Sequence, residues 1–151
     1  MKKFGATAIA AAVLLTGLAG SSMSGDAVGA SAPDRTQHVT RLVLHSIESH
    51  SPRPNRFLGV DRLRFLATHE IAGYDNFAGV FNPRNDRLRF WLSISLNGGL
   101  IDSYFEVDAG VTSFTGRITH GSGRFRGIQG TVHVLANPDT GRAVYTLRYS
   151  L

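Results

Sequence analysis

Hydrophobic and polar residues alternate along residues 87–96, RLRFWLSISL, and this period of two constrains the fold more than any other feature of the chain. Successive side chains of a β-strand point to opposite faces, so the segment predicts a strand with one buried face and one solvated face. The same alternation predicts strands near 39–48, 60–70, 74–82, 86–96, 99–108, 111–119, 128–136 and 142–150. No sustained helical period occurs after residue 38, so we expect an all-β domain over 38–151.

Short turn signals separate these strands, among them Asn97-Gly98, a dipeptide favoured in tight hairpins. Eight strands joined mostly by tight links indicate an antiparallel meander. An open sheet of eight strands would expose two edges that promote aggregation, whereas closure into a barrel removes both edges. We therefore predict an eight-stranded antiparallel up-and-down barrel, with a two-sheet sandwich as the alternative.

The alternation also predicts which side chains line the barrel. The inward positions are rich in aromatic residues, and a barrel of eight strands is just wide enough to be filled by side chains or to hold one small ligand. A solid core and an apolar pocket are both compatible with this pattern. If the lumen holds a ligand, the expected aromatic contacts are Phe65, Phe90, Phe105, Phe114 and Tyr149.

The first 32 residues have the pattern of a secretory signal peptide. Lys2 and Lys3 precede an uncharged apolar run over 6–20, and small residues follow it. The run is too short and too rich in Ala and Gly for a good membrane span. We expect cleavage between about residues 27 and 32 and a secreted, extracellular protein. The alternative is an uncleaved leader, which would be the only contact with a membrane.

Composition excludes several classes of chemistry. The chain has no cysteine, which excludes disulfides, thiol nucleophiles and Cys-ligated metals. The six histidines show no metal-ligand spacing, so no metal site is expected. After the leader all basic residues are arginines, and they are scattered rather than clustered with stacking aromatic residues. This distribution argues against a nucleic-acid partner.

A glycine-rich segment at 118–134, ITHGSGRFRGIQGTVHV, carries a family resemblance. It lacks the Gly-Lys-Ser/Thr ending and the strand–loop–helix context of a phosphate-binding loop, so its glycines are interpreted as turn and close-packing positions. The segment resembles the motif I-T-G-G-x-G-x-F/Y-x-G-A-x-G-x-V of the allene oxide cyclase and dirigent-like barrels, with His120 and Ile128 replacing a glycine and the alanine. The structural turn motif comprises Gly121, Gly123, Gly127 and Gly130.

The resemblance implies an eight-stranded barrel with an apolar cavity that needs no cofactor. Relatives of this kind hold a flexible apolar substrate in a reactive shape, and they form homodimers or homotrimers. The plant cyclases have a glutamate on the first strand where this chain has Ser46, so Ser46 is a candidate ligand contact. The resemblance thus implies a barrel that binds a lipid-like or polyketide-like molecule, or an isomerase or cyclase acting on it. An extracellular interaction module is a further alternative.

The residues themselves suggest three candidate catalytic groups. Glu48 and Asp61 flank the first hairpin on faces that are expected to point inward, and Tyr145 on the last strand can reach the lumen beside Ser46. Buried acids of this kind can do acid–base work when their environment changes their pKa. The alternating acids of the strand at 99–108 are instead expected on the outer face, paired with arginines of neighbouring strands.

Overall fold

The computed structural model describes residues 36–151, apart from the side chains of residues 46 and 47. The expected signal peptide at 1–32 and its cleavage site lie outside the described residues. The strands are β1 (His38–Arg53), β2 (Arg56–Phe65), β3 (Ile71–Asn82), β4 (Arg87–Leu96), β5 (Gly99–Asp108), β6 (Ser113–Gly121), β7 (Gln129–Asn137) and β8 (Arg142–Ser150). One short 3₁₀ helix, η1 (Gly123–Phe125), lies between β6 and β7.

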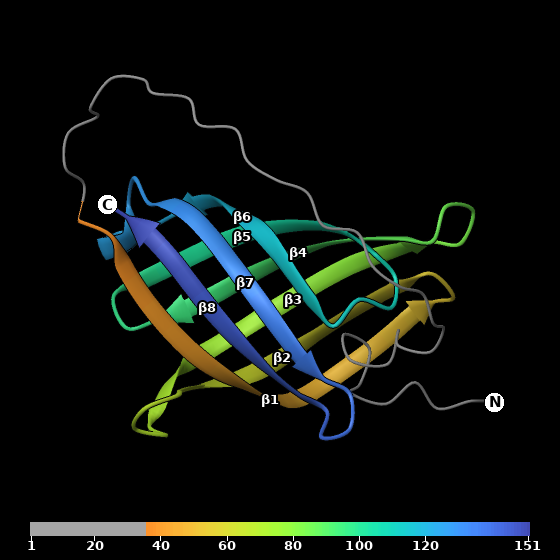
Figure 1. Cartoon of the computed structure of the whole chain (residues 1–151), viewed down its shortest axis with the longest axis horizontal. Helices are drawn as coiled ribbons and strands as arrows, with labels where there is room; N and C mark the ends of the chain where they lie inside the picture. The colour runs from red at the N-terminus through yellow and green to blue at the C-terminus, as the bar shows by residue number, and fades with distance from the viewer. Residues whose placement is uncertain (1–35) are drawn as a thin grey trace, which may run out of the picture.

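The eight strands form one closed barrel in the order of the sequence (Figure 1). Each strand pairs antiparallel with the next, and β8 returns to pair with β1, where Leu42 lies opposite Tyr145. This closing pair confirms the predicted up-and-down barrel and excludes the two-sheet sandwich. Among the described residues no helix is long and apolar enough to span a membrane.

The second strand differs from its predicted position. We expected a strand over 60–70, but β2 starts four residues earlier, at Arg56, and ends at Phe65. The chain then turns: the Phe65 N–H donates to the Glu70 carbonyl at 3.0 Å, and His69 has a left-handed φ of 61°. The residues between Phe65 and Glu70 include no Gly or Pro, so the usual sequence markers of a turn are missing.

The inward faces of all eight strands form one apolar core, as the alternation predicts. Phe90 and Phe105 stack face to face with ring centroids 4.5 Å apart, and Phe114 meets both rings edge-on. Glycines on neighbouring strands make room for these rings: a Cβ on Gly116 would lie 2.4 Å from the Phe105 ring, and one on Gly79 would lie 2.2 Å from the Phe57 ring. Large rings therefore pack over small residues across this part of the lumen.

The glycine-rich segment contains the end of β6, the helix η1 and the start of β7. Phe125 in η1 is only 2% exposed and meets Tyr149 edge-on with centroids 6.2 Å apart. Gly130 has a φ of 155°, and a Cβ there would lie 2.1 Å from the Arg148 carbonyl oxygen of β8. Gly127 has a φ of 82° with open space around it. The segment thus combines a turn with one close approach between strand backbones.

Candidate functional site

Two aspartates lie side by side inside the barrel. Asp61 on β2 and Asp75 on β3 are directly opposite each other in the antiparallel register. Asp61 is 2% exposed and Asp75 is fully buried. Side chains at such opposed positions have Cβ atoms about 5 Å apart. The barrel therefore holds an acid pair, Asp61 and Asp75, within an otherwise apolar lumen.

The environment of the acid pair opposes ionisation of Asp75. Burial raises the pKa of Asp75 to about 8, and the nearby negative charge of Asp61 contributes to the rise. The Tyr145 hydroxyl and the backbone of Asp61 counter part of this effect, because both favour the charged carboxylate. Asp75 is consequently protonated for the most part at neutral pH. A carboxyl with a pKa near neutrality can both donate and accept a proton.

Tyr145 reaches the acid pair from β8. Its side chain is 1% exposed, and its strand neighbours in register are Leu42 on β1 and Val134 on β7. Burial and the two aspartates raise the pKa of Tyr145 well above its ordinary range, so the phenol keeps its proton. The aspartates on β2 and β3 and the tyrosine on β8 thus form one polar cluster in the lumen.

The polar side chains of Asp75 and Ser103 in this lumen have few hydrogen-bond partners. Neither carboxyl oxygen of Asp75 has a hydrogen bond of good geometry within the described part of the chain, although the Tyr145 hydroxyl is close enough to influence its charge. The hydroxyl of Ser103 on β5, 1% exposed, also lacks a partner there. Buried polar groups are rarely left unsatisfied in proteins. This cluster is therefore the strongest candidate for a functional site.

Glu48 does not belong to the cluster, and its expected inward position is wrong. Ser46 lies opposite Asp61 in the β1–β2 register, but the next matched pair is Glu48 with Val60. Residue 47 is the extra residue of a β-bulge, and a bulge reverses the alternation of the residues that follow it. Glu48 is therefore exposed and accepts a hydrogen bond from His50 at 2.7 Å.

The remaining candidate contacts lie in different places. Phe90, Phe105 and Phe114 are buried in the lumen as expected. Tyr149 is partly buried at the end of the core, where it stacks on His38. The backbone of Ser46 lies opposite Asp61, but its side chain is outside the described residues.

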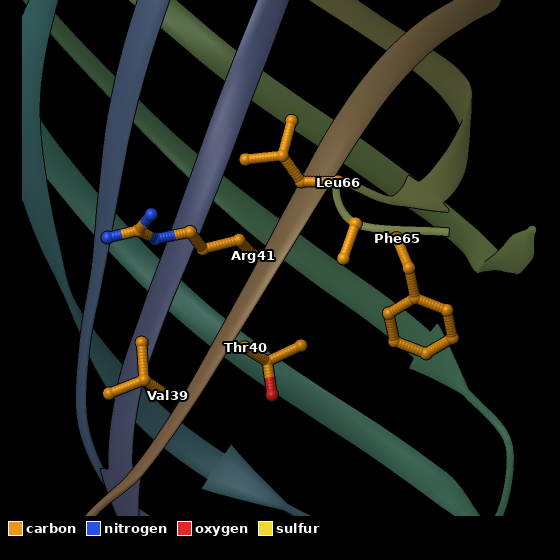
Figure 2. A pocket seen from close by; sticks show the side chains of 6 residues that line it. Val39, Thr40, Arg41, Phe65 and Leu66 are labelled. Carbon is orange, nitrogen blue, oxygen red and sulfur yellow. The ribbon is translucent and has the colours of Figure 1, made fainter. Parts of the chain in front are cut away.

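Phe65 is not in the lumen, contrary to expectation. It is 36% exposed, because β2 ends at this residue. Phe65 lines an open groove of about 490 Å³ between the start of β1 and the turn after β2 (Figure 2). The other residues that line this groove are Val39, Thr40, Arg41, Leu66 and Ala67.

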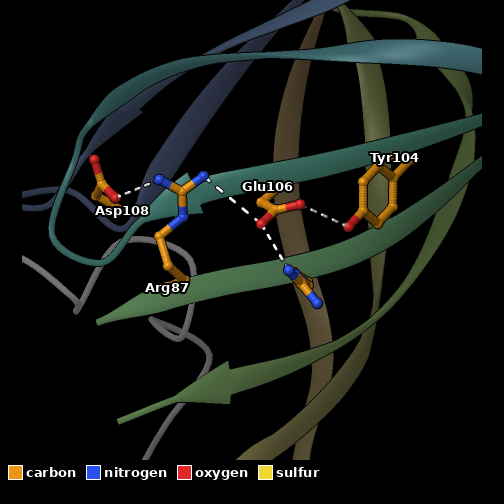
Figure 3. Close-up of polar contacts among 5 residues, drawn as sticks. Arg87, Tyr104, Glu106 and Asp108 are labelled. Carbon is orange, nitrogen blue, oxygen red and sulfur yellow. Dashed lines mark hydrogen bonds and ion pairs between the residues drawn. The ribbon is translucent and has the colours of Figure 1, made fainter. Parts of the chain in front are cut away.

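The acids of β5 face solvent, as the alternation predicts. Arg89 donates to Glu106 at 2.9 Å, and Arg87 donates to Asp108 at 2.9 Å (Figure 3). The hydrogen bond from Arg89 lowers the pKa of Glu106, so this acid is ionised at neutral pH. Tyr104 also donates to Glu106, at 3.2 Å. These cross-strand pairs belong to the outer wall, and exposed pairs of this kind stabilise a fold only modestly.

Asp75 is the residue that our sequence analysis missed. It lies two residues before Phe77 and four before Gly79, so it shares their inward face in the period of two. The sequence did contain a signal, because an acid that alternates with a phenylalanine and a glycine is expected on the same inward face as these two residues. Within residues 36–151, no group of three histidine or acidic side chains could hold a metal ion.

The fold and the cluster define the class of protein: a small, closed, eight-stranded β-barrel with acids buried in its lumen. No protein-family model and no curated protein matches this sequence. Solved structures do match. A pyocyanin demethylase aligns with 75% of this chain and all of its own, with a TM-score of 0.62 and 23% identity.

Two further solved structures share this barrel. A nonspecific haem-binding cyclase that catalyses a 4 + 2 cycloaddition in neoabyssomicin biosynthesis aligns over 78% of this chain and 64% of its own, with a TM-score of 0.62 and 16% identity. The pterocarpan synthase dirigent protein PsPTS1 aligns over 76% of this chain and 93% of its own, with a TM-score of 0.55 and 13% identity. At these identities the likeness establishes a shared fold.

Proposed function

We propose that the barrel binds a mainly apolar small molecule in its lumen and acts on it as a cofactor-independent cyclase or isomerase. The observation that carries this proposal is the fully buried Asp75, which faces Asp61 in an apolar barrel and has a pKa of about 8. Strongly perturbed acids in enclosed sites are typical of catalytic centres. The solved barrels of similar fold include enzymes named for reactions of small molecules.

The acid pair is costly for a barrel that only needs to be stable. Burying a carboxyl without full hydrogen bonding costs on the order of 1–3 kcal/mol or more, and hydrocarbon side chains at both positions would fill the lumen without this cost. Ile94, which lies opposite Asp75 on β4, illustrates the apolar residues found elsewhere at this level of the barrel. Retention of two acids is therefore better explained by chemistry than by packing.

The proposed reaction uses three properties of the cluster. Asp75 exchanges a proton with the substrate, since its pKa lies close to neutral pH. Tyr145 keeps its proton and offers a fixed hydroxyl beside Asp75. The rings of Phe90, Phe105 and Phe114 hold the apolar part of the substrate in one conformation. The substrate then loses its conformational entropy on binding rather than in the reaction step, which lowers the barrier of that step.

Substrate entry requires a side chain to move. The carboxyl oxygens of Asp75 and the hydroxyl of Ser103 have essentially no accessible surface. Tyr145 is among the largest fully buried side chains and contacts Asp75 directly, so its rotation is the simplest way to open the site. We further propose that the protein acts after export, because the apolar run over residues 6–20 has the pattern of a signal peptide.

Native mass spectrometry of protein secreted by its own host tests this function. We expect a co-purified small molecule whose complex survives in Asp108→Asn, which changes only an exposed acid on the outer wall. Asp75→Asn should retain or weaken binding but abolish conversion of that molecule, because the amide cannot exchange the proton. Folded protein that carries no ligand, and that also fails to bind the neutral dye N-phenyl-1-naphthylamine, contradicts the proposal.

A further inference from the structure

The lumen has acids but no buried base. The buried polar or charged residues in the described part of the chain are Asp61, Asp75 and Ser103. Every arginine from residue 41 onward is exposed or only partly buried. Arg62, next to Asp61 in sequence, has the opposite parity on β2 and is only partly buried. Within residues 36–151, no arginine or histidine is therefore fully buried in the lumen with Asp75.

The groups that face Asp75 cannot supply a positive charge. Asp61 faces it from β2, and Ile94 lies opposite it on β4. Tyr145 approaches it from β8 with a neutral hydroxyl. The Tyr145 hydroxyl and the Asp61 backbone are the donors beside Asp75, and neither makes a hydrogen bond of good geometry to its buried carboxyl oxygens. A buried carboxylate is strongly unfavourable unless a cation or several donors accompany it.

We propose that the ligand of this lumen carries a positively charged nitrogen within an otherwise apolar body, and that this nitrogen binds beside Asp75. The inference rests on the proposed function, since it names the class of substrate for the same site. On binding, the Asp75 carboxyl loses its proton to solvent and becomes the carboxylate partner of the ligand cation. The charges of Asp75 and of the ligand cation then cancel each other.

A cationic nitrogen also fits the proposed chemistry. The ionised Asp75 is a base that is ready to take a proton from the ligand, and a positive nitrogen increases the acidity of the adjacent C–H bonds. In an isomerisation, Asp75 removes one such proton and returns it to a different atom of the same molecule. The step is balanced without an oxidant or a reductant. A neutral ligand that only accepts a hydrogen bond would leave Asp75 protonated.

Two probes of matched shape distinguish these cases: N-methylquinolinium, which is cationic, and 1-methylnaphthalene, which is neutral. Isothermal titration calorimetry near pH 7, in phosphate and in Tris, measures affinity and the number of protons released, because the two buffers differ in ionisation enthalpy. We expect the cation to bind at least about tenfold more tightly. Its binding should release a proton number that approaches one, whereas the neutral probe should release none.

Variants localise the effect. Asp75→Asn should abolish proton release and reduce the two probes to similar affinity, while Asp108→Asn on the outer wall should behave like wild type. If Asp75→Asn does not fold, the proton count of the wild type still decides the question. Equal or tighter binding of the neutral probe overturns the charge inference and leaves lumen binding intact. Failure of both probes to bind wild-type protein contradicts lumen binding itself, and the inference with it.

Discussion

At the scale of single residues, Asp75 should make the stability of the barrel depend on pH in an unusual direction. Its pKa is about 8 in the folded chain, against an ordinary value of 3.8. Between these values the folded state holds a proton that the unfolded state has lost, so the free energy of unfolding falls as pH rises. The stabilising contribution is complete below about pH 4 and is lost by about pH 8.

Urea denaturation of wild type and Asp75→Asn across this range measures the effect. We expect the free energy of unfolding of the wild type to fall by several kcal/mol relative to that of the variant between about pH 5 and about pH 9, because the asparagine at position 75 cannot ionise. The difference between the two proteins removes the contribution of titrating groups that do not interact with Asp75. Asp108→Asn, which changes an exposed acid, should run parallel to wild type. Parallel profiles for wild type and Asp75→Asn would contradict a raised pKa at this residue.

Single-residue alternation predicted much of the candidate site. It placed Asp61, Phe90 and Tyr145 on inward faces, and all three are buried. It could not reveal that Asp75 lies opposite Asp61, because this contact depends on the register between two strands rather than on either strand alone. The catalytic roles of Asp61 and Tyr145 stay predictions.

At the scale of elements, irregularities in the strands decided where sequence analysis failed. The bulge after Ser46 moved Glu48 to the outside, and the turn after Phe65 ended β2 early. Neither irregularity is marked by glycine or proline. The turn after β2 is held instead by tertiary pairing, for example by the hydrogen bond from the Leu66 N–H to the Arg41 carbonyl at 3.1 Å. Regular strands with clear turn signals, such as β4 and β5 around Asn97-Gly98, matched their predicted bounds to within one residue.

The turn between β6 and β7 offers a matched pair of substitutions. In Gly130→Val the new Cβ would lie 2.1 Å from the Arg148 carbonyl oxygen, so β7 and β8 would have to separate. In Gly127→Val the space is open, and the cost is that of a left-handed backbone for a branched residue, about 1–3 kcal/mol. We expect Gly130→Val to prevent folding and Gly127→Val to fold with a lower Tm by circular dichroism. Equal melting of the two variants would contradict the close approach at Gly130.

At the scale of the whole molecule, seven of the eight strand pairings join neighbours in sequence, and one joins the two ends of the domain. That last pairing, β1 with β8, brings His38 opposite Tyr149 and leaves neither strand as a free edge. The need to protect sheet edges predicts this closure without reference to any particular side chain. Strand number and turn spacing therefore favoured the barrel over the two-sheet sandwich, and the β1–β8 pairing excludes the sandwich.

This topology predicts that the β1–β8 seam forms late in folding. Closing a loop of more than a hundred residues has a larger entropic cost than forming a hairpin across Asn97-Gly98, so neighbouring strands should pair first. Leu147 on β8 and Leu92 on β4 are both almost completely buried, and truncation of either to alanine should cost about 2–5 kcal/mol. In chevron measurements we expect Leu92→Ala mainly to slow folding and Leu147→Ala mainly to speed unfolding. A reversed pattern would mean that the seam belongs to the folding nucleus, and that the barrel closes before its central hairpin is complete.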